Sequence, residues 1–302
     1  MSKLMRRKIL LLASVLLISG TTLLAGPELL VISSGGASRP AVVRVDAQTG
    51  NILQRYAAEQ ENVCGVAVDA AGEIFLSGNT LGLGEIARVG APVATPALSH
   101  PAFTMPGNLK IGPAGDIYVI SAASINGAYR GQVLKFDRRT GALAGGFVGS
   151  ENTGTTWTDL AFGPDGMLYV SDQTLGVMRF DPATGEFLGV FVPAGPDGPR
   201  AASALAFGPD GNLYVADRDA SSVLRFNGQT GRFMDNFISS QTGGLKGPAS
   251  LAFGSNHQLY VSSSENHSIL RYDGRTGAFT GKVLSDNPNL PNPTHLVFAS
   301  LP

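Results

Sequence analysis

The heptapeptide LAFGPDG occupies residues 160–166 and recurs, letter for letter, at residues 205–211. A near-copy, LAFGSNHQ, begins at Leu251. In each copy an apolar triplet leads into a glycine-containing turn, and a second apolar run of the form LYV follows. A catalytic motif is normally needed once, so these copies indicate a structural repeat.

The second apolar run marks the repeat along the chain. It recurs at intervals of 45, 43, 51, 45 and 46 residues. Each unit contains short runs rich in Val, Leu, Phe and Tyr, separated by Gly, Pro, Asp and Asn, which predicts four antiparallel strands joined by hairpins. Helical spacing never persists for two turns, so we predict no helix after the N-terminal segment. The marker runs are Leu29–Val31, Ile74–Leu76, Ile117–Val119, Leu168–Val170, Leu213–Val215 and Leu259–Val261.

The turns between the strands follow two patterns. The sequence GPDG at residues 163–166 favours a type I turn, with positive φ at its last glycine. Between the third and fourth strands a Thr-Gly pair recurs in five units, which indicates a second backbone position that requires positive φ. These five pairs begin at Thr49, Thr140, Thr184, Thr230 and Thr276.

Four-stranded units that repeat every ~45 residues are typical of the β-propeller. The first unit lacks a LAF-type strand, and residues 295–300 at the other end of the chain match that missing strand. The sequence therefore predicts an all-β fold. We expect a six-bladed β-propeller of four-stranded antiparallel blades, closed by the C-terminal strand, which completes the first blade.

The N-terminus has the layout of a secretory signal peptide. Four basic residues precede an apolar run from Ile9, and small and apolar residues follow to Ala25. We predict a signal peptide at residues 1–25 and one propeller domain at 26–302, exported to the periplasm or the extracellular space, with no stable membrane span after cleavage. The alternative is an uncleaved anchor over Ile9–Ala25. An internal disulfide is impossible with the single cysteine, Cys64, for which we expect a buried structural role.

Composition narrows the possible partners. The chain has 22 basic and 23 acidic residues, and removal of residues 1–25 takes away four of the basic ones. Nucleic-acid binding needs clustered positive charge, so this function class is excluded. A hydrophobic content of 43% is sufficient for a packed core, and we expect a monomer.

A candidate site lies where the innermost strands of the blades begin, at the mouth of the central channel. Four of the six residues at this position are polar, and each comes from a different blade, so they could hold a small polar ligand. The six residues are Gly65, Asn108, Asp159, Ala204, Ser250 and His295.

Two further residues extend this candidate site. Lys110 stands where other blades have the alanine of LAF, and it could receive an anionic ligand or form an ion pair with Asp159. Trp157, the only tryptophan, could stack on a ligand or pack on a neighbouring blade. The candidate ligand-binding set is therefore Asn108, Lys110, Trp157, Asp159, Ser250 and His295.

The aligned blades resemble the NHL-repeat propellers. The matching stretches are LAFGPDGNLYVADRDASSVLRFNGQTG at residues 205–231 and LAFGSNHQLYVSSSENHSILRYDGRTG at residues 251–277. The resemblance implies an interaction module or, alternatively, an enzyme such as a regucalcin-type lactonase or the streptogramin B lyase. The lactonases hold Ca²⁺ in the channel; here Asn108 and Asp159 match, and the early glutamate is absent.

No catalytic constellation stands out in the sequence. The four histidines lack paired metal-ligand spacing, and neither a Ser-His-Asp nor a Cys-His arrangement is visible. We therefore expect a non-enzymatic binding module for a protein or a small polar ligand, without a cofactor. The alternative is a lactonase or lyase dependent on Ca²⁺ or Mg²⁺, with Asn108 and Asp159 as ligands and His295 as acid–base.

Overall fold

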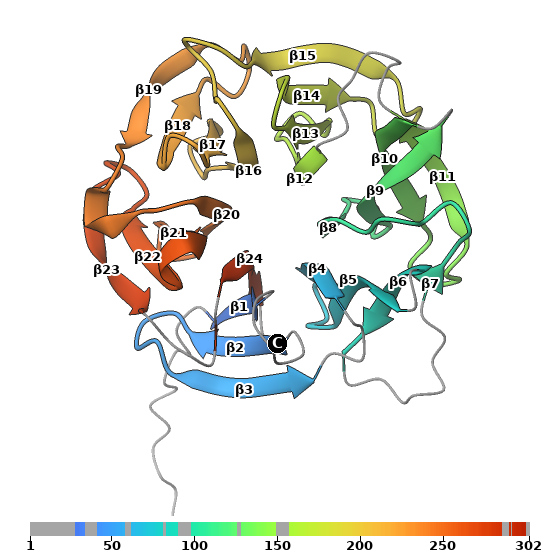
Figure 1. Cartoon of the computed structure of the whole chain (residues 1–302), viewed down its shortest axis with the longest axis horizontal. Coiled ribbons are helices and arrows are strands. Elements are labelled where there is room, and N and C mark those ends of the chain that lie inside the picture. Colours follow the sequence, from blue (N-terminus) through green and yellow to red (C-terminus); the bar gives the residue numbers. More distant parts are fainter. Residues whose placement is uncertain are drawn as a thin grey trace, which may run out of the picture.

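The computed structural model shows sheets arranged radially around a central axis (Figure 1). The predicted signal peptide lies outside the described residues. Within the part of the chain that the structure describes, no helix is long and apolar enough to cross a membrane. The described residues are 28–33, 41–57, 62–80, 83–89, 98–125, 128–148, 157–285, 290 and 292–299.

The fold is an all-β propeller with four-stranded antiparallel blades, as the sequence predicts. The expectation of no helix is wrong for two single 3₁₀ turns, η1 (Thr242–Gly244) and η2 (Ser264–Asn266). Strand pairing gives six four-stranded sheets. From inner to outer strand they are β24 (Pro293–Ala299), β1 (Glu28–Ser33), β2 (Ala41–Asp46) and β3 (Ile52–Ala57); β4 (Asn62–Val68), β5 (Ile74–Thr80), β6 (Leu83–Arg88) and β7 (Leu98–Ser99); β8 (Leu109–Ile111), β9 (Ile117–Ile125), β10 (Ala128–Phe136) and β11 (Leu143–Val148); β12 (Trp157–Phe162), β13 (Leu168–Asp172), β14 (Gly176–Phe180) and β15 (Phe187–Pro193); β16 (Ala202–Phe207), β17 (Leu213–Asp217), β18 (Ser222–Phe226) and β19 (Phe233–Ile238); and β20 (Pro248–Phe253), β21 (Gln258–Ser263), β22 (Ser268–Asp273) and β23 (Phe279–Leu284).

One sheet combines the two ends of the described chain. The C-terminal strand β24 pairs antiparallel with β1, and Leu296 lies opposite Val31. Leu296 is buried and belongs to the same core cluster as Val43 on β2 and Tyr260 on β21. The C-terminal strand thus contacts both its own sheet and the neighbouring one.

The repeated turn fixes a buried tyrosine. In the first copy the amide of Gly166 donates to the carbonyl of Gly163 (3.0 Å), and Gly166 has φ 78°. The carboxylate of Asp165 accepts hydrogen bonds from the amide of Met167 and from the hydroxyl of Tyr169. Asp210 anchors Tyr214 in the same way in the second copy. The polar letters of GPDG therefore hold the tyrosine of the next strand.

Those tyrosines connect neighbouring sheets. Each one packs edge to face on the phenylalanine that ends the inner strand of the following sheet, with ring centroids 4.9 to 5.1 Å apart. Such pairs contribute about 0.5–1.5 kcal/mol each beyond the area they bury. The LAF-type and LYV-type motifs thus recur because, at these four interfaces between sheets, the tyrosine of one motif packs on the phenylalanine of the other. The pairs are Tyr118–Phe162, Tyr169–Phe207, Tyr214–Phe253 and Tyr260–Phe298.

The Thr-Gly turns have the positive φ that the sequence predicts. At Gly231 φ is 71°, and the side chain of Asn227 accepts the amides of Gln229 and Thr230. A β-carbon on Gly231 would lie 2.1 Å from the carbonyl oxygen of Phe191 on the preceding sheet's outer strand. Glycine is therefore required here for conformation and for close approach to the neighbouring sheet.

Candidate functional site in the central channel

A β-bulge sets the direction of the inner-strand residues. In β12 the register shifts between Trp157 and Asp159, so that Thr158 is the extra residue. The same shift occurs in β16 before Ala204 and in β20 before Ser250. A bulge re-aims the side chains that follow it. The candidate residues Asp159 and Ser250 are thus placed by a backbone feature that their sheets share.

Asp159 is the centre of the polar cluster. It is 3% exposed, and its Oδ1 accepts the amide of Leu160 (2.8 Å) and the Nδ2 group of Asn108. Its Oδ2 accepts the amide of Leu205 on β16 (3.2 Å). One carboxylate therefore connects the inner ends of three neighbouring sheets, and hydrogen bonds to the charged form offset its burial.

Lys110 completes the charge balance. Its Nζ lies 3.8 Å from Oδ1 of Asp159, and its side chain is 26% exposed. In the strand register Lys110 is opposite Tyr118, just as Ala161 is opposite Tyr169. The lysine therefore replaces the alanine of LAF. The ion pair between Lys110 and Asp159, one of the two alternatives that the sequence left for this lysine, is present.

His295 and Ser250 contribute from neighbouring inner strands. Ser250 accepts the amide of Leu296 on its hydroxyl oxygen (3.0 Å), next to His295. The Nδ1 atom of His295 lies 3.1 Å from the hydroxyl of Thr294. Desolvation lowers the pKa of His295 to about 4, while Asp159 raises it and Lys110 lowers it further. The imidazole is therefore neutral at neutral pH, and it senses both charges of the cluster.

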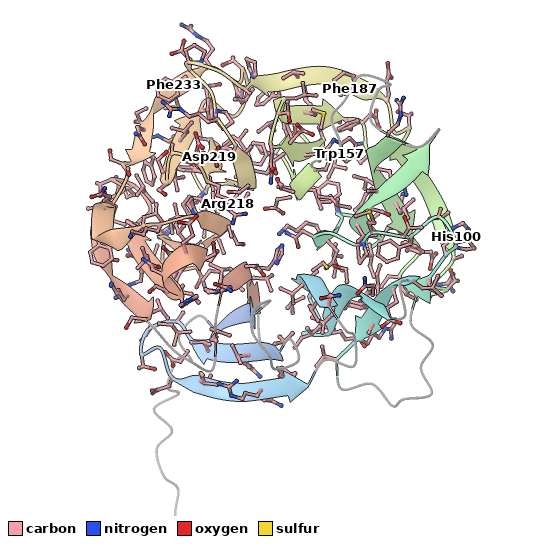
Figure 2. All side chains as sticks on the ribbon, viewed as in Figure 1. His100, Trp157, Phe187, Arg218, Asp219 and Phe233 are labelled. Carbon is pink, nitrogen blue, oxygen red and sulfur yellow. The ribbon has the colours of Figure 1, made fainter. Side chains whose placement is uncertain are left out.

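Trp157 belongs to the hydrophobic core. It is 7% exposed, its ring centroid lies 5.5 Å from that of Phe180, and the indole lies against Gly131 on the neighbouring β10 (Figure 2). Of the two alternatives for this residue, packing on a neighbouring blade is the one observed. A role of Trp157 in stacking on a ligand stays a prediction.

Hydroxyl groups at the bulge also bridge the sheets, and sequence reasoning missed them. Thr158 donates to the carbonyl of Ala202 (2.9 Å), and Ser203 donates to the carbonyl of Pro248 (2.6 Å). The sequence carried a signal for them, because a hydroxyl residue stands one place before the candidate position in both strands: Thr158 before Asp159 and Ser203 before Ala204. Cys64 is the bulge residue of β4, and burial raises the pKa of its thiol, as suits a structural role.

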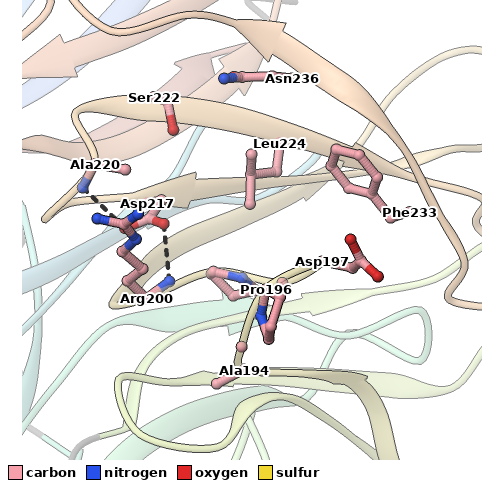
Figure 3. A pocket seen from close by; sticks show the side chains of 13 residues that line it. Ala194, Pro196, Asp197, Arg200, Asp217, Ala220, Ser222, Leu224, Phe233 and Asn236 are labelled. Atoms are coloured by element: carbon pink, nitrogen blue, oxygen red, sulfur yellow. Dashed lines mark hydrogen bonds between the residues drawn. The ribbon is translucent and has the colours of Figure 1, made fainter.

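Sequence reasoning also missed a groove that none of the channel candidates lines. A groove of about 630 Å³ runs along the loop before β16, and Phe233, Asn236 and Asp197 border it (Figure 3). Asp217 fixes this loop by accepting the amide of Arg200 (2.8 Å). Asp217 therefore has an architectural role.

The channel cluster offers limited chemistry. It contains one cation, one carboxylate whose oxygens already accept hydrogen bonds, a neutral imidazole and an amide. In the described parts of the chain no three His, Cys, Asp or Glu side chains come together in a metal-binding group. The arrangement can hold and orient a small polar molecule.

Comparisons with known proteins show likeness in fold. No family model and no curated protein matches the chain. Among solved structures it is similar to a protein of unknown function from Bacteroides caccae (TM-score 0.70, 18% identity) and to a structure of a nidogen/laminin complex (TM-score 0.69, 13% identity). It is also similar to a periplasmic gluconolactonase of Pseudomonas aeruginosa (TM-score 0.60, 17% identity). Each similarity covers 91% of this chain and 99% of the other.

Proposed function

We propose that this protein is an exported, monomeric propeller of the NHL type that binds a protein or a small polar ligand at the mouth of its channel, without catalysis. The observation that carries the proposal is the convergence of Asn108, Lys110 and Asp159, with His295 at the equivalent position of the inner strand β24. Of the similar structures, one is a protein–protein complex and one is periplasmic. Both agree with an exported binding module.

The proposal includes a closed ring of six blades, with β24 as the closing strand. The inner strands make contacts in the order β24, β4, β8, β12, β16, β20 and back to β24. Pairing of β24 with β1 joins the ends of the chain within one sheet. A closed ring leaves no sheet face without a neighbour, which is the usual reason for propeller closure.

Ligand binding at the channel is tested by mutating His295, whose side-chain hydrogen bond among the described residues is to Thr294 on the same strand. We expect a ligand found by thermal-shift screening of small polar molecules to lose about tenfold in affinity in His295→Ala, because a hydrogen bond and shape are lost. His257→Ala, on an exposed turn, is the matched control. A ligand that binds both variants equally well would place binding outside the channel.

The alternative function is a Ca²⁺- or Mg²⁺-dependent lactonase or lyase, with Asn108 and Asp159 as ligands and His295 as acid–base. The reason to consider this alternative is that the fold is similar to that of a gluconolactonase. The donor set does not fit a divalent cation well. Lys110 lies on the Asp159 carboxylate, whose oxygens also accept two amides, and Asn108 directs its Nδ2 group, a donor, at the same carboxylate. A divalent ion prefers several free oxygen ligands.

Metal titration separates the two functions. We expect the melting temperature to stay unchanged in millimolar Ca²⁺ or Mg²⁺, because a cation would have to displace the Lys110 ammonium. A site filled to 100 times its Kd stabilises a fold by about 2.7 kcal/mol, a readily measured rise. A rise that saturates, and that disappears in Asp159→Asn, would support the metal-dependent enzyme.

A further inference from the structure

We propose that the channel ligand is a small monoanion that carries a carboxylate, held by the ammonium of Lys110 and the imidazole of His295. This inference rests on the proposed channel site and names the class of ligand that it takes. It follows from the number of free donors and acceptors in the cluster, the size of the residues around Lys110 and the charge balance of the channel.

The acceptor capacity of Asp159 is largely used. Its two oxygens accept the amides of Leu160 and Leu205 and the side-chain amide of Asn108, and Lys110 lies 3.8 Å away. A ligand that offers a further cation or donor finds the carboxylate already surrounded. The cluster therefore disfavours a cationic ligand.

Lys110 retains donor capacity. An ammonium has three N–H donors, and its contact with Asp159, at 3.8 Å, is longer than a direct hydrogen bond. Its side chain is 26% exposed, although Asp159 beside it is buried. The lysine can therefore bind an anion from the channel while it continues to balance Asp159.

Lys110 is longer than the residues at the same position of four other sheets. In four other sheets the residue at the same register position is an alanine opposite the aromatic residue of the second strand. A methyl group extends little from the strand, so the lysine is the long side chain among these positions. The four alanines are Ala67, Ala161, Ala206 and Ala252.

His295 provides the second contact. When its Nδ1 accepts the hydroxyl proton of Thr294, at 3.1 Å, Nε2 carries the hydrogen and can donate to a carboxylate oxygen. On β24 His295 follows a bulge at Thr294, just as Asp159 follows the bulge at Thr158 on β12, so the two residues occupy equivalent positions of their inner strands. Two donors, one charged and one neutral, suit the two oxygens of a carboxylate.

Charge balance disfavours a ligand with two negative charges more than a ligand with one. With His295 neutral, the formal charges of Lys110 and Asp159 cancel. A monoanion leaves the channel with one net negative charge, whereas a dianion leaves two beside a buried carboxylate, and like charges at short range repel. The Lys110 side chain is the sole cation that the described contacts of Asp159 include.

The test is an NMR titration of the His295 ring in the full protein at neutral pH and constant ionic strength. The probes are acetate, its neutral methyl ester, succinate and inorganic phosphate. We expect acetate to shift the ring signals saturably and to bind at least about tenfold more tightly than the ester, because a charge-assisted contact is involved. Equal binding of the ester, or no saturable shift with acetate, would overturn the proposal.

Variants assign the charge to Lys110. Acetate affinity should fall by about tenfold or more in Lys110→Met and recover in Lys110→Arg, while Lys282→Met on exposed β23 should behave as wild type. Unchanged affinity in a folded Lys110→Met protein would refute the assignment. Comparison of acetate with its ester in the wild type decides the question even if that variant fails to fold.

Other outcomes separate this inference from the proposed function. Tighter binding of succinate or phosphate than of acetate would overturn the monoanion assignment and leave a channel site for dianions. If a neutral or cationic ligand binds to the wild type and no longer binds to His295→Ala, the inference that the ligand is an anion is wrong, while the proposed function stands. If none of the tested molecules binds in the channel, both the inference and the proposed channel function are wrong.

Discussion

Removing residues 293–302 is expected to abolish cooperative folding. The deletion takes away β24, so β1 loses its inner partner and Tyr260 loses its edge-to-face contact with Phe298. Substituting a buried leucine such as Leu296 by alanine alone costs about 2–5 kcal/mol, and a typical domain has only about 5–15 kcal/mol of stability. Loss of the whole strand exceeds that margin. Circular dichroism melts and limited proteolysis measure the effect.

The matched control for this deletion is a chain that ends at Ala299, which retains all of β24. A synthetic peptide of residues 293–302 should restore folding in trans by strand addition, and a scrambled peptide should not. If the chain without β24 melts like the control, the C-terminal strand does not close the propeller.

The architecture could be predicted because each repeated letter has a local role. The aspartate of GPDG anchors a tyrosine four residues later, and that tyrosine packs on the phenylalanine of the next LAF. Interactions of short range and fixed spacing leave a periodic signal in the sequence. The same reasoning located the C-terminal strand, because residues 295–300 carry the pattern that the first unit lacks.

The candidate site could be predicted only in part. Asn108, Asp159, Ser250 and His295 follow from one position per unit, and Lys110 follows from its departure from alanine. Contacts across sheets then depend on the bulge, which the letters do not reveal. Simple alternation places Trp157 on the same face as Asp159, but the extra residue at Thr158 makes them neighbours in register and turns them to opposite faces.

The groove at the loop before β16 shows the same limit. Residues 195–198 again read GPDG, and the amide of Gly198 donates to the carbonyl of Gly195 (3.1 Å), as in the strand-linking turns. Here the turn borders a hollow beside Phe233 instead of joining two strands. The hydrogen bond is the same, but the positive φ lies at Gly195 (140°) and not at the last glycine, so identical letters give a different turn in these surroundings.

Replacing Asp159 with alanine is expected to destabilise the protein by about 2–3 kcal/mol. Removing one partner of a buried ion pair costs about 3–5 kcal/mol, and the partial exposure of Lys110 reduces that figure. The amide of Leu205 and the side chain of Asn108 also lose their acceptor. Urea unfolding, followed by the fluorescence of the buried Trp157 and by circular dichroism, measures the loss.

A double-mutant cycle distinguishes the ion pair from the rest of the network. In Asp159→Ala/Lys110→Met the unpaired ammonium is absent, so the double variant should lose less stability than the sum of the single variants by about 1 kcal/mol or more. Asp219→Ala, in the exposed turn after β17, controls for the loss of a carboxylate. Strict additivity, or a loss below ~0.5 kcal/mol in Asp159→Ala, would contradict the central role of this carboxylate. The predicted coupling means that Asp159 positions Lys110, and in the proposed site this carboxylate would support ligand binding through that lysine.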